Sequence, residues 1–249
     1  MAGAVVAVAG AADTRFMLDF RAADGSRERG RLMSCAGVRF EDVSPVRPFR
    51  FEKGLRNFAG WWYFATTGTH VGFESWLERD HLMLMDFDPA VAAVASQPFW
   101  LRWRDEGGRD RRHAPDYFAR TRGGSAVVVD VRPDDRIPER DAETFAVTAA
   151  ACESAGWEYR RSGDLDPVLV ANVRWLSRYR HPRNQAPQVA AVLLEAFTGR
   201  RGLFEGAELA GDRLRTLPVL FHLMWQRQLT ADLSVPLGMT TIVWPGGTR

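Results

Sequence analysis

Three acidic residues have the types and spacing of a site for divalent cations. Asp116 follows Pro115, which disfavours helix just before it, and precedes an apolar strand-like pair. Asp130 directly follows the apolar run 126–129, and Glu78 lies in an amphipathic segment upstream. Carboxylate oxygens are hard ligands for Mg²⁺, and such a cation activates water against a phosphodiester. The pattern predicts a metal-dependent nuclease site. Taken alone, Asp116 is an ordinary turn residue and Asp130 a solvated strand end.

The acidic residues belong to an ordered series of segments that resembles the PD-(D/E)xK nuclease superfamily. More narrowly, the series is similar to TnsA, the endonuclease subunit of heteromeric cut-and-paste transposases. The order and spacing of the segments carry the resemblance, which runs through residues 72–80, 85–89, 96–98, 113–117 and 129–133. The resemblance implies hydrolysis of one DNA strand at each end of a mobile element, with two Mg²⁺ ions, or Mn²⁺ in their place.

The resemblance also assigns individual residues. In the family pattern the metal-facing glutamate follows Ser-x-Leu, which is Ser75-Trp76-Leu77 here, so Glu78 joins Asp116 and Asp130 as a ligand. The carbonyl of Val131 is a further candidate ligand.

Two positions are alternatives or supporting candidates. Glu74 lies one helical turn before Glu78 and on the same face. A solvated helix face is the competing interpretation for either glutamate. Gln97 matches a recurring family position beside the ligands, and an ordinary strand-edge amide is the competing interpretation.

Arg132 stands where the superfamily pattern has lysine, two residues after Asp130 and on the same strand face. Arginine does not lose its proton as a lysine with a depressed pKa can. It can still orient the attacking water and stabilise charge developing on a phosphate. Lys53 is the only lysine of the chain, so the replacement follows a general avoidance of lysine.

Basic residues surround Asp116 and are candidates for contact with the DNA backbone. Solvated loop side chains are the competing interpretation. They are Arg109, Arg111, Arg112, His113, Arg120 and Arg122. A second basic stretch, 174–183, carries aromatic residues and is a candidate for DNA or a protein partner.

The elements that must position these residues predict an α/β fold. We expect a helix over 73–86, strands at 99–103, 117–118 and 126–129, a helix over 138–154 and a strand at 157–160. This order favours a restriction-endonuclease-like mixed sheet flanked by helices. Residues 51–70 read as an aromatic loop. Helices at 168–179, 188–197 and 217–229, followed by a β-prone end, indicate a small winged-helix-like module. The predicted segments are a hairpin extension (1–50), a nuclease domain (51–165) and the helical domain (166–249).

Composition bounds the function. The chain has 249 residues, 46% hydrophobic and 26% charged, as in a globular domain, and its first apolar run is too short for a membrane span. We therefore expect a cytoplasmic protein without a membrane partner. Cys35 and Cys152 predict two reduced thiols rather than a zinc cluster. A net charge of +2 does not by itself indicate DNA binding, so the argument for DNA depends on how the charges are distributed.

The resemblance implies two protein partners, a transposase with an RNase H-like fold and an ATPase regulator that contacts the C-terminal region. The sequence leaves two alternative functions open. One is a subunit whose site has lapsed but which still binds DNA or the transposase. The other is a stand-alone restriction or repair nuclease.

Overall fold

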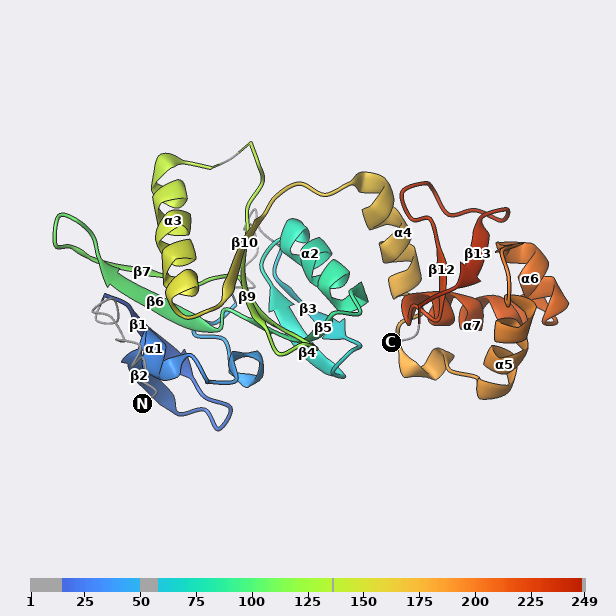
Figure 1. Cartoon of the computed structure of the whole chain (residues 1–249), viewed down its shortest axis with the longest axis horizontal. Helices are drawn as coiled ribbons and strands as arrows, with labels where there is room; N and C mark the ends of the chain where they lie inside the picture. Colours follow the sequence, from blue (N-terminus) through green and yellow to red (C-terminus); the bar gives the residue numbers. More distant parts are fainter. Residues whose placement is uncertain (1–14, 50–57, 136, 248–249) are drawn as a thin grey trace, which may run out of the picture. The chain divides into compact units, whose positions relative to one another are not determined.

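A computed structural model describes residues 15–49, 58–135 and 137–247 (Figure 1). The chain forms two compact units, each built from two stretches of sequence. The first unit contains residues 1–48 and 93–162, and the second contains 49–92 and 163–249. These units differ from the predicted segments 1–50, 51–165 and 166–249, because strands from the first fifty residues pair with strands from the centre of the chain.

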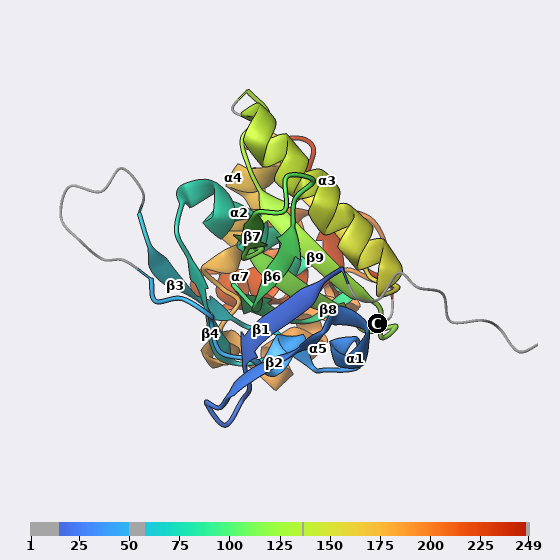
Figure 2. The same ribbon diagram turned by 90° about the vertical axis from the view of Figure 1, so that its left-hand side faces the viewer.

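The first unit contains a four-stranded antiparallel sheet in the order β2-β1-β6-β7 (Figure 2). The predicted hairpin forms β1 (Met17–Arg21) and β2 (Arg27–Arg31), and it turns at Gly25, whose φ of 86° suits glycine. β1 also pairs with β6 (Phe99–Arg104), which pairs with β7 (Asp110–His113). The hairpin is therefore an integral edge of this sheet.

A second sheet has the order β10-β9-β8-β5. Its strands are β5 (Val91–Ser96), β8 (Tyr117–Thr121), β9 (Ala126–Val131) and β10 (Glu158–Ser162). β9 is antiparallel to β8 and parallel to β10, and helix α3 (Glu139–Ser154) connects β9 to β10. The predicted mixed α/β fold is confirmed.

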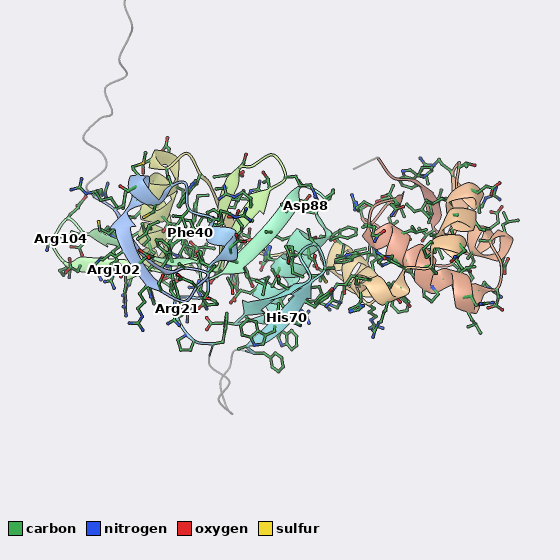
Figure 3. The ribbon with its side chains drawn as sticks, turned by 90° about the horizontal axis from the view of Figure 1, so that it is seen from below. Arg21, Phe40, His70, Asp88, Arg102 and Arg104 are labelled. Atoms are coloured by element: carbon green, nitrogen blue, oxygen red, sulfur yellow. The ribbon has the colours of Figure 1, made fainter. Side chains whose placement is uncertain are left out.

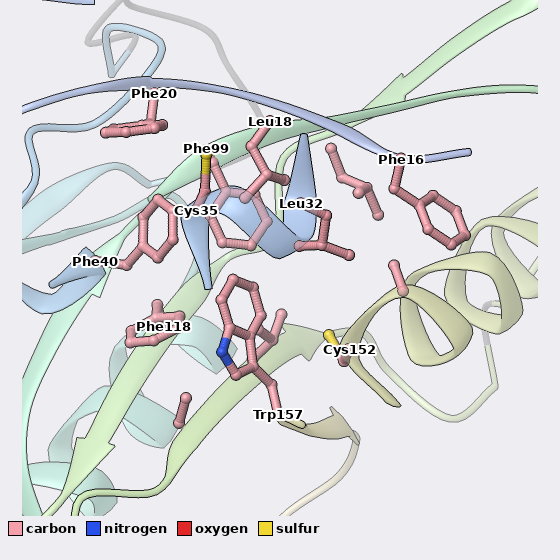
Figure 4. Close-up of a cluster of buried hydrophobic side chains, with 14 of the residues drawn as sticks. Phe16, Leu18, Phe20, Leu32, Cys35, Phe40, Phe99, Phe118, Cys152 and Trp157 are labelled. Atoms are coloured by element: carbon pink, nitrogen blue, oxygen red, sulfur yellow. The ribbon is translucent and has the colours of Figure 1, made fainter. Parts of the chain in front are cut away.

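The core of the first unit lies where side chains of the two sheets, α3 and the short elements α1 (Leu32–Cys35) and η2 (Phe40–Asp42) meet (Figure 4). Phe40 is fully buried, and its ring packs edge-on against Trp157 at 5.6 Å. The alternation of β1 explains the arrangement, because Leu18 and Phe20 point into this core while Asp19 and Arg21 do not. Cys35 and Cys152 are free and buried in it.

The second unit begins with a hairpin that corrects the predicted loop over 51–70. β3 (Gly60–Phe64) and β4 (Thr69–Phe73) pair antiparallel, whereas residues 51–57 lie outside the described residues. The period-two burial of Trp62 and Phe64 is the strand signal that the aromatic composition obscured. Helix α2 (Trp76–Phe87) follows, where a helix over 73–86 was predicted.

The rest of the second unit is mainly helical, as expected. It contains α4 (Pro167–Ser177), η3 (Pro182–Asn184), α5 (Pro187–Ala196), α6 (Leu203–Leu209) and α7 (Arg213–Trp225). A small antiparallel sheet has the order β11-β13-β12, with β11 (Arg201–Gly202), β12 (Leu229–Ala231) and β13 (Ile242–Pro245). No helix in the described part of the chain has the length and apolar character that crossing a membrane requires.

Candidate active site

Asp116 lies in the bend just before β8, and Asp130 lies near the end of the neighbouring strand β9. The antiparallel register pairs Tyr117 with Val129, the residues next to Asp116 and Asp130. Both aspartates line the same pocket. Asp116 Oδ2 accepts a hydrogen bond of 2.7 Å from the Val131 N–H. The two predicted ligands are thus brought together.

Asp130 is a buried carboxylate with two side-chain donors. Only 2% of it is exposed. His113 Nε2 lies 2.9 Å from Oδ1 and 3.0 Å from Oδ2, and the Tyr159 hydroxyl donates to Oδ2 at 2.8 Å. These bonds offset the desolvation of the carboxylate. Burial, followed by the charge of Asp130, raises the pKa of Tyr159 far above its usual value, so its proton stays available to the carboxylate.

Sequence reasoning missed Tyr159. The signal lies in the parallel register of β9 and β10, which pairs Tyr159 with Val128 and so places it on the same face as Asp130. The charge of Asp130 also acts on the nearby Cys152 thiol. Burial, with a smaller contribution from Asp130, raises the pKa of the Cys152 thiol to about 12, so this thiol is protonated at neutral pH.

A pocket of about 270 Å³ opens beside the two aspartates. Val131 and Arg132 line it from the end of β9, and Arg112, His113 and Trp100 line it from β6 and β7. The Arg132 side chain is half exposed, and its guanidinium lies 3.4 Å from Asp141 on α3. The backbone N–H of Arg132 donates to Ser162 and thereby fixes the end of the strand.

Glu78 belongs to the second unit, where its carboxylate closes the start of α2. Oε2 accepts from the Glu74 N–H at 2.7 Å, Oε1 accepts from the Ser75 hydroxyl at 2.9 Å, and the Ser75 oxygen accepts from the Glu78 N–H. This is a capping box, in which a serine and a glutamate satisfy backbone donors at a helix N-terminus. The Ser-x-x-Glu spacing therefore has a structural explanation within α2.

Gln97 forms a backbone hydrogen bond with Asp116. Its N–H donates to the Asp116 carbonyl at 2.9 Å, and its side chain is 2% exposed. Its φ is 47°, a left-handed conformation that is uncommon for a residue other than glycine. Among the described residues, its buried Oε1 has no hydrogen-bond partner. Gln97 thus lies in the strained turn between β5 and β6 rather than at an ordinary strand edge.

The predicted DNA-contacting residues fall into different environments. Arg111 lies on β7 rather than in a loop. Arg109 and Arg111 both pair with Asp105. Arg120 pairs with Glu41 at 3.1 Å and is only 21% exposed. Arg122 lies in the turn between β8 and β9. Of the six, only Arg112 and His113 line the Asp116 pocket.

The second basic stretch is partly structural. Arg180 donates to the Tyr63 carbonyl, and its guanidinium lies 4.0 Å from the centroid of Trp62. Arg174 pairs with Asp80 at 2.8 Å. Both arginines therefore join α4 and its following turn to the hairpin and helix α2 of their unit.

Across the described ranges, no group of three or more His, Cys, Asp or Glu side chains is arranged to hold a metal ion. No protein-family model matches the chain, and no curated protein is significantly similar to it in sequence.

Proposed function

We propose that the chain is a Mg²⁺-dependent DNA endonuclease, acting as the strand-cutting subunit of a transposase. The observation that supports this most is that Asp116, just before β8, and Asp130, on β9, line one pocket together with Arg132. Two carboxylates and a cation at the end of paired strands are the parts that metal-assisted hydrolysis of a phosphodiester requires.

The donor set fits a hard divalent cation. Asp116 and Asp130 offer carboxylate oxygens, and the Val131 carbonyl is a further oxygen ligand of the kind that Mg²⁺ takes. Such a cation, when bound, lowers the pKa of a water ligand and stabilises negative charge on the phosphate. His113 and Tyr159 donate to Asp130 and hold its carboxylate in orientation. Arg132 supplies a fixed positive charge toward the scissile phosphate.

The similarity of the sequence segments to TnsA supports the rest of the assignment. It suggests a restriction-endonuclease-like core, a winged-helix-like C-terminal module, a second transposase subunit with an RNase H-like fold and an ATPase regulator. Glu78 is the ligand that this similarity supplies, with Glu74 as its alternative.

A second candidate function has an observation in its favour. Asp130 already accepts hydrogen bonds from His113 and Tyr159, and Arg132 takes the place of a lysine that can act as a base. A scaffold that has lost catalysis can keep a buried carboxylate for structural reasons alone. The alternative is therefore a DNA- or transposase-binding subunit without nuclease activity.

The test is strand-specific cleavage of mobile-element-end DNA by the chain and a candidate partner transposase with an RNase H-like fold, with Mg²⁺ or Mn²⁺. Asp116→Asn preserves volume and an acceptor for the Val131 N–H, so we expect a folded variant with cleavage lowered by two orders of magnitude or more. Asp232→Asn, an exposed position in the second unit where the amide oxygen can still accept from Ser234, is the matched control. Equal cleavage by wild type and Asp116→Asn would remove the site. Absence of cleavage by the wild-type assembly, with partner binding intact, would favour the lapsed subunit. Cleavage of arbitrary DNA by the chain alone would favour a stand-alone nuclease.

A further inference from the structure

The outer face of the β2-β1-β6-β7 sheet is dominated by arginine. Side chains alternate between the faces of a strand, and the register brings alternate residues of all four strands to the side opposite the core. This outer sheet face carries seven arginines and two aspartates. The arginines are Arg21, Arg27, Arg29, Arg31, Arg102, Arg104 and Arg112, and the aspartates are Asp19 and Asp110. Their formal sum is +5, whereas the whole chain carries +2.

Several of these arginines are held in place. Asp19 lies centrally and pairs with Arg29 on one neighbouring strand and with Arg102 on the other. The Arg112 guanidinium lies 4.4 Å from the centroid of the Trp100 ring. Such contacts lower the entropy that an arginine loses when it binds a ligand. The face is thus partly organised before any ligand arrives.

Other arginines of the face are available for a ligand. Within the described ranges, no carboxylate lies at ion-pair distance from Arg21, Arg27 or Arg31. Arg27 and Arg31 are exposed on the edge strand β2. Figure 3 shows Arg21, Arg102 and Arg104 along one margin of the first unit, with Phe40 inside it. Unneutralised cations at this density attract a polyanionic partner.

The outer sheet face is continuous with the candidate active site. A groove of about 370 Å³ is lined by four arginines, two carboxylates and a tryptophan, which are Arg21, Arg27, Arg29, Arg102, Asp19, Glu28 and Trp100. Trp100 also lines the pocket that contains Asp116 and Asp130. A ligand lying along the groove therefore reaches the two carboxylates without leaving the first unit.

We propose that the outer sheet face binds the sugar-phosphate backbone of duplex DNA and leads it to Asp116 and Asp130. This inference rests on the proposed nuclease function. Guanidinium groups match phosphate geometry bidentately and stay charged. A duplex is favoured over a single strand because the aromatic side chain of the face, Trp100, already has Arg112 stacked on it and offers little platform for bases. Backbone contacts of this kind position DNA without reading its sequence.

Equilibrium binding of the full chain to a labelled duplex, measured without divalent metal at several salt concentrations, tests the proposal. Each phosphate contact contributes about 0.9 to the slope of log affinity against log salt. Arg27→Ala and Arg31→Ala should each lower the slope by about one and weaken binding about eightfold at 0.1 M salt. The double variant should lower the slope by about two and weaken binding roughly sixtyfold at 0.1 M salt, the product of the two single losses. An unrelated duplex should show the same losses.

Arg160→Ala is the charge-matched control. Arg160 lies on β10 of the other sheet and pairs with Glu158. The same affinity and slope for Arg27→Ala/Arg31→Ala as for Arg160→Ala would overturn the proposal, as would tighter binding of a single strand of the same length. Because the assay contains no divalent metal and needs no cleavage, it separates this proposal from the nuclease proposal. A chain that binds as described but never cuts would refute only the latter.

Discussion

His113 Nε2 lies within 3.0 Å of both carboxylate oxygens of Asp130. The sequence placed this histidine among the DNA contacts and the aspartate among the metal ligands. In the structure these two side chains contact each other and line the same pocket. A histidine that donates to a ligating carboxylate fixes its orientation and its basicity. His113 therefore helps to fix the orientation of the Asp130 carboxylate in the pocket.

Tyr159→Phe should destabilise the first unit by about 1 to 3 kcal/mol, the usual cost of removing a hydrogen bond to a buried charged group. The ring is retained, so packing changes little. Chemical denaturation measures the loss, and Tyr63→Phe, whose ring packs against His181 in the other unit, is the control. If both variants unfold at the same denaturant concentration as the wild type, the Tyr159 hydroxyl does not support Asp130.

Local signals in the sequence were sufficient for some elements of the structure. The valine run before Asp130 and the proline before Asp116 located two strand ends, because burial and backbone restriction act locally. The pairing of Asp130 with His113 and Tyr159 was not predictable, because it depends on the register of β9 with β10 and on where β7 lies. The role of Glu78 at the start of α2 had a local signal in Ser75. The resemblance to the nuclease family predicts metal binding by Glu78 instead.

Glu78→Gln separates the two roles of that residue. Glutamine keeps the acceptor that a capping box needs, so we expect thermal stability close to that of the wild type. Glu78→Ala should cost about 1 kcal/mol through loss of the cap. If Glu78 also ligates metal, Glu78→Gln should abolish cleavage at unchanged stability, and Glu74→Gln should leave it nearly intact. Normal cleavage by Glu78→Gln would leave capping as its sole role.

Arg132 should act as a fixed cation rather than as a base. Arg132→Lys retains the charge and should keep much of the cleavage activity, whereas Arg132→Ala should lose about a hundredfold or more. The half-exposed pair with Asp141 contributes little to stability, so both variants should unfold like the wild type. Cleavage rates of the three forms in the full assembly decide the matter. Wild-type rates in Arg132→Ala would mean that its place beside the pocket has no catalytic consequence.

Gln97 offers a test of backbone strain beside Asp116. Gln97→Gly and Gln97→Ala remove the same buried amide, but only glycine adopts a φ of 47° without steric cost. The glycine variant should be more stable than the alanine variant by about 1 to 2 kcal/mol. Denaturation midpoints of the two variants give the difference directly. Equal midpoints would show that the turn relaxes when the side chain is removed.

The second unit should lose stability when the pH falls from about 7 to about 5. Burial lowers the pKa of His222 and of His81, whose ring nitrogens lie 2.7 and 2.8 Å from the carbonyls of Tyr179 and Gly163. A histidine with a folded pKa below its unfolded value of about 6.5 takes up its proton first in the unfolded chain. Acidification through that window therefore favours unfolding, and the loss levels off below the folded pKa.

Asp86 has the opposite sign. Burial raises its pKa from 3.8, so the folded state binds the proton more readily and its destabilising contribution weakens on acidification. Urea midpoints at several pH values measure the net effect. His81→Gln/His222→Gln should flatten the dependence between pH 7 and 5, because glutamine does not titrate and can still donate to both carbonyls. A variant with the same slope as the wild type in that range would mean that other groups govern the acid sensitivity of this unit.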